Sequence, residues 1–336
     1  MTIKDLAAKT GYGVATISRV LNNQPNVSEK ARRAILKAVE ESGFQINANA
    51  RQLKQQHSTC ILVVVKGTGN ELFGEMVEAI QSQIAKAGYP LYVDYDDEDA
   101  NEVLRAVRLC REKKPLGILF LGGNSRNFLA DFGKIRVPCV LITNDASGLP
   151  FPNLSSVSAD DRQAARSAVD ALIEQGHRKI VVVGGDRTSS DTSRLRYEGC
   201  MQSLRTHGMD FDEERDYCSV RYSYQDGYNA TKDLLSKGRE FTALFAVADV
   251  MAIGAIRALR DHGLRVPEDV SVVGFDGLPL GSYLVPQLTT VAQPVQQMAR
   301  HGVDILLDAI IHGTSARHET VAFSLQQRES TRRIQE

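Results

Sequence analysis

The residues near the N-terminus that are best suited to chemistry lie around a short turn between two predicted helices. Ala7 is followed four positions later by Gly11, and Ile17 comes six positions after that. Ala7 lets the helices approach, Gly11 suits the left-handed backbone of a tight turn, and Ile17 packs the second helix on the first. The positions that remain outward at the start of the second helix are Val14, Ala15, Ser18 and Arg19. Side chains so placed can enter the major groove of DNA, whereas a helical hairpin without a nucleic-acid role is the alternative.

Charge divides the chain just after this region. Residues 1–57 hold nine Lys and Arg against four Asp and Glu, a formal charge of +5. The rest holds 31 basic against 37 acidic residues, so a total of −1 conceals a basic head on an acidic body. A basic head favours a phosphate backbone, and an acidic body avoids non-specific attachment to it.

Several motifs along the whole chain carry a family resemblance. The N-terminal ones are Ile3-Lys4-Asp5-Leu6-Ala7, Ser18-Arg19-Val20-Leu21-Asn22-Asn23, Val27-Ser28 and Glu41-Ser42-Gly43-Phe44. Later ones are Gly176-His177-Arg178-Lys179-Ile180, Arg196-Tyr197-Glu198-Gly199, Asp249 through Gly254, Ser271 through Asp276 and Leu288-Thr289-Thr290-Val291. Together they resemble the LacI/GalR family of bacterial transcriptional regulators, which implies operator binding controlled by a small-molecule effector.

The resemblance assigns roles within the first 57 residues. Residues 1–45 form a three-helix helix-turn-helix head in which Val14 and Ala15 read bases. The residues expected to position the DNA backbone are Thr16, Ser18, Arg19 and Asn22. Residues 46–57 are polar with an isolated Leu53, and the family has here a hinge helix that orders on DNA. Leu53 is then a minor-groove wedge, because it has no core to join, with Ala50, Arg51 and Lys54 beside the DNA.

From residue 58 onward, short apolar runs alternate with amphipathic helices. The runs expected to be buried strands are Cys60–Val65, Leu116–Leu121, Val137–Ile142, Ile180–Val183, Leu244–Val247 and Val270–Phe275. This alternation predicts an α/β fold of parallel sheets with helices on both faces. The strands are too many for one compact unit, so two lobes are expected, and the resemblance implies a periplasmic-binding-protein-like core over 58–336. The N-lobe should take about 58–157 and 291–318, and the C-lobe about 158–290 and 319–330.

Ligands of open parallel sheets bind beyond the carboxyl ends of the strands. The residues expected there are Glu71, Phe73, Thr143, Asp249 and Asp276, with Arg196 on the helix after Val183-Gly184-Gly185. An Arg and an Asp that converge can chelate vicinal sugar hydroxyls, since charged partners make the stronger hydrogen bonds. The resemblance adds Tyr222 as an aromatic platform for a sugar ring. The family usually has Asn-Asp where this chain has Ala248-Asp249, and it often has Asp where this chain has Thr143. The resemblance therefore does not imply the hexose specificity that is typical of the family.

Other features favour no second chemistry. The five cysteines have no metal-ligand spacing, no nucleophile elbow is present, and no metal or cofactor is predicted. The acidic run Asp94–Asp99 is interpreted as a solvated loop rather than a cation site, because it lacks EF-hand spacing. No signal peptide or membrane span is expected, which predicts a cytoplasmic protein, associated with the nucleoid when it is bound to DNA.

The leading hypothesis is therefore a DNA-binding regulator, in this family most often a repressor, with a sugar or sugar derivative between its lobes. An enzyme is not predicted, since no nucleophile–base pair or metal is apparent. The alternative is a cytoplasmic sugar-binding or sugar-processing protein with the basic head as a tether. One recognition helix covers few bases, so a homodimer on a pseudo-palindromic operator is expected. Its predicted contacts are the helix around Met76–Ile84 and the helix Val303–Ile311.

Overall fold

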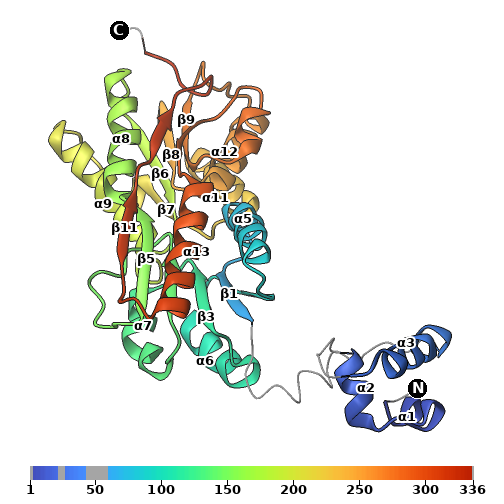
Figure 1. Cartoon of the computed structure of the whole chain (residues 1–336). Coiled ribbons are helices and arrows are strands. Elements are labelled where there is room, and N and C mark those ends of the chain that lie inside the picture. The colour runs from blue at the N-terminus through green and yellow to red at the C-terminus, as the bar shows by residue number, and fades with distance from the viewer. Residues whose placement is uncertain (1–2, 22–26, 43–59, 335–336) are drawn as a thin grey trace. The chain divides into compact units, whose positions relative to one another are not determined.

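The computed structural model describes residues 3–21, 27–42 and 60–334, and the chain divides into two compact units, Met1–Ser58 and Thr59–Glu336 (Figure 1). The first unit contains α1 (Ile3–Thr10), α2 (Val14–Leu21) and α3 (Glu29–Ser42). Its small core consists of buried Leu6, Ile17, Val20, Ile35 and Ala38. The predicted segment 46–57 lies outside the described residues.

The turn between α1 and α2 has the conformation predicted from the sequence. Gly11 has φ +72° and its amide donates to the Ala7 carbonyl at 3.0 Å. A left-handed residue of this kind ends the first helix, and glycine adopts it without steric cost. Ser28 caps the start of α3, because the Ala31 amide lies 3.3 Å from the Ser28 hydroxyl.

The N-lobe of the second unit is a six-stranded sheet of order β11-β5-β4-β3-β1-β2, in which all neighbours are parallel. Its strands are β1 (Ile61–Lys66), β2 (Leu91–Asp96), β3 (Gly117–Leu121), β4 (Cys139–Ile142), β5 (Leu154–Ala159) and β11 (His318–Val321). Its helices are α5 (Leu72–Lys86), α6 (Glu102–Lys113), α7 (Ser125–Asp131), the 3-10 turn Phe132–Lys134 and α13 (Val295–His312).

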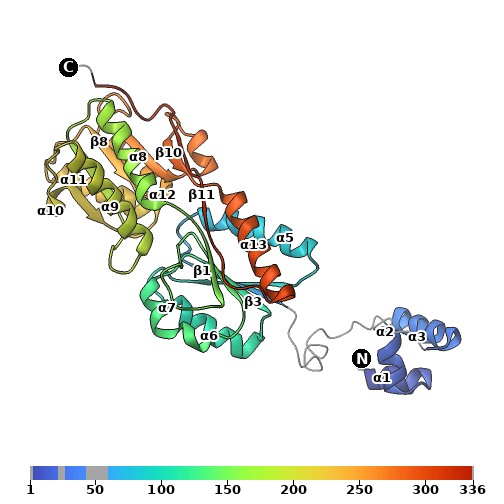
Figure 2. The same cartoon turned by 60° about the vertical axis from the view of Figure 1, so that its left-hand side comes forward.

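Both faces of this sheet are covered by helices, which explains the continuous apolar run of β1. Alternate residues of a strand point to opposite faces. Ile61, Val63 and Val65 join the apolar cluster of α5 and α13, whereas Leu62 and Val64 join that of α6 and α7. The turned view in Figure 2 shows these two helix pairs on opposite sides of the sheet.

The C-lobe repeats this plan with the order β12-β10-β9-β8-β6-β7, parallel except for the antiparallel pair of β10 and β12. Its strands are β6 (Ile180–Gly184), β7 (Tyr217–Ser219), β8 (Ala243–Ala246), β9 (Ser271–Asp276), β10 (Thr289–Ala292) and β12 (Ser324–Gln326). Its helices are α8 (Asp161–Glu174), α9 (Asp191–Thr206), α10 (Glu213–Asp216), α11 (Tyr224–Ser236), α12 (Asp249–Asp261) and the 3-10 turn Pro279–Ser282. The prediction of two parallel-sheet lobes is confirmed.

The chain passes between the lobes three times. The crossings lie between β5 and α8, between β10 and α13, and between β11 and β12. The predicted lobe limits, 157/158, 290/291 and 318/319, precede these crossings by a few residues. The apolar pattern does not mark where a strand leaves one sheet, because burial continues to the end of β5 and through all but the last residue of β10. In the part of the chain that the structure describes, no helix is long and apolar enough to span a bilayer.

Candidate nucleic-acid interface and ligand cavity

The face of α2 predicted to meet DNA is open to solvent in the first unit. The Val14 side chain is 37% exposed, and Ala15 and Arg19 are exposed as well. Thr16 and Ser18 are half-buried, since α2 turns Ile17 and Val20 into the core. The other predicted DNA contacts, Asn22, Ala50, Arg51, Leu53 and Lys54, lie outside the described residues.

The second unit contains a cavity of about 250 Å³ lined by both lobes. Five residues predicted as ligand contacts line it: Phe73, Thr143, Arg196, Tyr222 and Asp276. They come from the segments that follow the carboxyl ends of β1, β4, β6, β7 and β9, as the rule for open parallel sheets requires. The cavity thus collects side chains that are up to 210 positions apart in the chain, the separation of Lys66 and Asp276.

Arg196 is the buried cation of the C-lobe wall. Its Nε donates to Asp161 Oδ1 at 2.7 Å and its Nη1 to the Val247 carbonyl at 2.6 Å. Its guanidinium also lies 3.7 Å from the centroid of the Phe275 ring. Burial alone would lower the pKa of Arg196, but Asp161 and Asp276 raise it above its ordinary value, so the side chain stays charged. These contacts fix the guanidinium before any ligand arrives.

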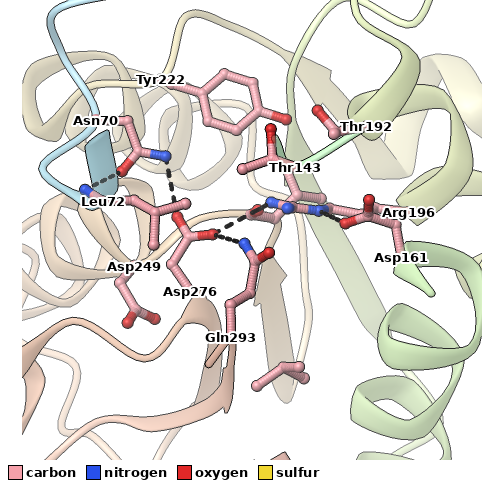
Figure 3. Close-up of polar contacts among 12 residues, drawn as sticks. Asn70, Leu72, Thr143, Asp161, Thr192, Arg196, Tyr222, Asp249, Asp276 and Gln293 are labelled. Carbon is pink, nitrogen blue, oxygen red and sulfur yellow. Dashed lines mark hydrogen bonds and ion pairs between the residues drawn. The ribbon is translucent and has the colours of Figure 1, made fainter. Parts of the chain in front are cut away.

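Asp276 connects this wall to the N-lobe (Figure 3). Its Oδ2 accepts from Asn70 Nδ2 at 3.0 Å across the cleft, and its Oδ1 accepts from Gln293 Nε2 at 2.8 Å. Arg196 Nη1 lies 3.6 Å from the same Oδ1. Burial raises the pKa of Asp276 to about 6, against the opposing effect of Arg196. The group is therefore a strong acceptor that has incomplete charge compensation in the protein.

Two cavity residues have strained backbones. Thr143 has φ +84° and Asp276 has φ +117°, backbone angles that residues other than glycine rarely adopt. Each lies at the end of a strand, Thr143 after β4 and Asp276 in β9. Such strain costs on the order of 1–3 kcal/mol per residue and persists where the surroundings impose it. Thr143 and Asp276 both line the cavity, and backbone strain of this kind is typical of functional sites.

Glu71 and Asp249, also predicted as ligand contacts, are not among the residues that line the cavity. Glu71 is exposed just before α5. Asp249 is fully buried and accepts from the amides of Gly277 and Leu278 and from the Thr290 hydroxyl. Figure 3 shows its carboxylate turned away from Tyr222 and Thr143. The strand-end rule gives a residue's place at the sheet edge but not the direction of its side chain.

Asp249 still bears on the cavity, because it holds the turn that follows Asp276. Its three hydrogen bonds fix residues 277–278 and tie them to β10. Burial, and next the charge of Asp276, raise the pKa of Asp249 to about 7. The two carboxyl groups thus oppose each other's ionisation.

Four residues that line the cavity or belong to its polar network were not predicted from the sequence: Asn70, Asp161, Gln293 and Lys66. Asn70 follows β1 just before the predicted Glu71, so the strand-end rule applied to it equally. Asp161 and Gln293 lie at two lobe crossings, where no sequence pattern distinguishes them. Lys66 lines the cavity and donates to buried Glu102 at 2.9 Å and to the Ala100 carbonyl. The ion pair of Lys66 with Glu102 could not be predicted, because the two residues are 36 positions apart and share no sequence pattern.

Comparisons with known proteins agree with this architecture. The family model described as bacterial regulatory proteins, lacI family, matches residues 2–47, and one described as a periplasmic binding protein-like domain matches residues 169–331. The transcriptional regulator MalR of Clostridium butyricum is 36% identical over 98% of this chain and 99% of its own. Catabolite control protein A of Priestia megaterium is 31% identical over 91% of each chain.

Solved structures agree as well. A lac repressor dimer bound to operator and the anti-inducer ONPF has a TM-score of 0.80 at 26% identity, covering 99% of both chains. A complex of the transcriptional regulator CelR with cellobiose has a TM-score of 0.71 at 28% identity, covering 98% of this chain and 99% of that one.

A helix-turn-helix head in front of a two-lobed ligand-binding core defines a class of DNA-binding transcriptional regulators. The chain belongs to the lacI family of bacterial regulatory proteins within that class.

Proposed function

We propose that this protein is a repressor whose affinity for its operator is set by a small polyhydroxy molecule bound between the lobes. The hydrogen bond from Asn70 to Asp276 is the observation that carries the proposal. It joins the N-lobe to a C-lobe network of Arg196, Asp161 and Gln293, so a ligand that competes for Asp276 acts on the contact between the lobes. A ligand changes the DNA-competent population only by its differential affinity for the two lobe arrangements.

The chemistry of the cavity favours a sugar or sugar derivative. Ionised groups such as Asp276 and Arg196 make strong hydrogen bonds to hydroxyls. Phe73 and Tyr222 supply aromatic faces for the apolar side of a ring. The cellobiose complex of CelR is a further support, since that protein has the same fold over nearly its whole length. The cavity volume of about 250 Å³ is at the small end for ligand sites, which favours a ligand of few rings.

The head is proposed to read DNA through Val14 and Ala15, with Thr16, Ser18, Arg19 and Asn22 on the backbone. Their exposure on α2 supports this assignment for Val14, Ala15 and Arg19. Small apolar side chains can contact a thymine methyl but cannot donate to guanine. Exchange of Ala15 for Gln should change the preferred operator in a selection from random DNA. An unchanged preference would contradict the assignment.

We also propose that the chain acts as a homodimer, the state of the lac repressor structure that it resembles. The predicted contacts, the helix around Met76–Ile84 and the helix Val303–Ile311, stay a prediction: Met76, Ile80, Val303 and Leu306 are buried, whereas Ile311 is 58% exposed. A second group of exposed large apolar residues consists of Leu280, Tyr283 and Val285, at 39%, 82% and 89%. An exposed apolar patch of this kind is typical of an interface. Light scattering should give a dimer for wild type and a lower mass for Tyr283→Asp, and a wild-type monomer at micromolar concentration would contradict the proposal.

The repressor function is tested by binding of DNA from the region upstream of the protein's own gene. A thermal-shift screen of sugars, sugar phosphates, nucleosides and purines first identifies ligands, because binding to the folded state raises the melting temperature. The proposal predicts a DNA complex whose affinity changes when such a ligand is added. Turnover of a ligand without DNA binding would favour the sugar-processing alternative.

A further inference from the structure

The acidic run Asp94–Asp99, expected from the sequence to be a solvated loop, makes contacts across the cleft. Arg221 of the C-lobe donates from Nε to Glu98 at 2.9 Å and from Nη2 to Asp97 at 2.5 Å, and both acids follow β2 in the N-lobe. Asp99 lies 3.6 Å from the same Nη2. One arginine is thus surrounded by three carboxylates of the opposite lobe. Because its side chain is 50% exposed, these pairs are weak and easily broken.

The second contact is a close approach of backbone to backbone. A Cβ atom built on Gly69, in the loop after β1, would lie 2.4 Å from the Tyr222 carbonyl oxygen. Gly69 does not have a left-handed backbone, so the approach of the C-lobe, and not its conformation, requires glycine here. A methyl group at this position would act as a wedge between the lobes.

Both contacts meet at the backbone of one cavity residue. Gly69 touches the carbonyl of Tyr222, and the Tyr222 amide donates to Glu98 Oε2 at 3.4 Å. The Tyr222 ring lines the cavity, with its hydroxyl 2.7 Å from that of Ser193. The N-lobe therefore holds the peptide groups on either side of the ring that faces the ligand.

We propose that Gly69, Glu98 and Arg221 are positioning residues that form a latch, holding the cleft closed and Tyr222 in place before a ligand arrives. The inference depends on the proposed function only in taking this cavity as the effector site. Ligand entry then requires the latch to open. Since exposed ion pairs are screened by salt, the open population should rise with ionic strength.

The test is amide hydrogen exchange of the full-length, ligand-free protein, measured by mass spectrometry. The reporter is Ser125, whose amide donates at 2.7 Å to Asp191 of the C-lobe in a separate cross-lobe contact. Gly69→Ala should accelerate exchange about three- to tenfold in the peptides with Tyr222 and with Ser125, while β3 and β8 stay protected. Gly74→Ala is the matched control, because a Cβ there has no atom within 4 Å. A local disturbance at residue 69 would leave Ser125 unchanged.

Arg221→Gln keeps the proposal testable if Gly69→Ala folds poorly, since Arg221 is at the surface. It should accelerate the same two peptides a few-fold, and 1 M NaCl should bring wild type toward the variant. Arg257→Gln removes an exposed ion pair to Asp261 within one helix and should have no such effect. Unchanged Ser125 exchange in both Gly69→Ala and Arg221→Gln would overturn the latch. Because no ligand is used, that outcome leaves the proposed function untouched.

Discussion

The two lobes share one strand order but differ in the chemistry of the wall that each presents to the cavity. Asp276 at the end of β9 corresponds to Thr143 after β4, and both have a positive φ. Arg196 on the helix after the first C-lobe strand has Phe73 as its N-lobe counterpart on α5. The C-lobe thus places charged groups where the N-lobe has an uncharged hydroxyl and a ring.

From this difference we infer that the C-lobe holds the ligand in place and that the N-lobe moves when the ligand binds. The C-lobe charges are held by one another and by the backbone, through Asp161 and the Val247 carbonyl for Arg196. The N-lobe reaches them through a neutral amide, Asn70. Lys66, the one N-lobe cation among the described residues that line the cavity, is satisfied inside its own lobe by Glu102. A rigid charged pair in the C-lobe and a neutral amide of the N-lobe that docks against it suit a cleft that opens and closes.

The largest effect is expected from removal of the C-lobe cation. Arg196→Met should lower the free energy of unfolding by about 3–5 kcal/mol, because Asp161 and Asp276 remain buried without their partner. Urea unfolding followed by circular dichroism measures this.

Arg194→Met, on the same helix, is the matched control. Its partners Asp191 and Glu198 are partly exposed, so the loss should stay below about 1 kcal/mol. Similar losses for the two variants would contradict a preorganised charged wall.

The next effect is a dependence of stability on pH that originates in the C-lobe. The pKa of Asp249 is raised to about 7 by burial, so between about pH 4 and 7 the folded state holds a proton that the unfolded chain has released. Stability contributed by this group is present at low pH and is lost as pH rises through 7. Asp249→Asn should therefore lose less stability than wild type from pH 5 to 8, by about 3 kcal/mol, since each of the two units from pH 5 to the pKa of about 7 is worth about 1.4 kcal/mol.

The control for this titration is Asp269→Asn. Arg265 holds the pKa of Asp269 at about 2, well below the measured window, so this variant should follow the wild-type profile in parallel. Parallel profiles for Asp249→Asn and wild type would show that Asp249 is ionised throughout.

The smallest effect is expected at Thr143, the uncharged counterpart of Asp276 in the N-lobe. Thr143→Gly relieves the strain of φ +84° and loses one hydrogen bond to Asn144, so its stability should stay within about 1 kcal/mol of wild type. Thr143→Ala loses the same hydrogen bond and keeps the strain. Glycine should thus be more stable than alanine here, opposite to the usual order, and calorimetric melting compares the two. A higher melting temperature for Thr143→Ala than for Thr143→Gly would show that the backbone of Thr143 is not strained.

The sequence predicted those parts of the molecule that follow from local pattern. The alternating apolar runs predicted the two parallel sheets, and the spacing of Ala7, Gly11 and Ile17 predicted the turn of the head. The ends of the predicted strands indicated which residues lie near the cavity, because ligands of open parallel sheets bind beyond the carboxyl ends of the strands.

Contacts that depend on the direction of a side chain or on closure of the lobes were not predictable in this way. Asp249 and Asp276 both follow C-lobe strands, yet one turns to the backbone of residues 277–278 and the other to Asn70. Arg221 and Asp97 lie 124 positions apart and meet only because the two lobes close on each other. No periodicity within a segment records such a contact.

The central claim is that the charged C-lobe wall passes the ligand signal to the DNA-binding head. It is tested most directly by operator affinity with and without a ligand from the thermal-shift screen, for wild type and Asp276→Asn. The variant should keep wild-type affinity for DNA without ligand, because the amide oxygen that replaces the carboxylate can still accept from Asn70. The ligand concentration needed for half the effect should rise about 10- to 100-fold, the value of a lost charged hydrogen bond. A full response of the variant at the wild-type concentration would contradict the claim, and so would a ligand that binds without changing DNA affinity.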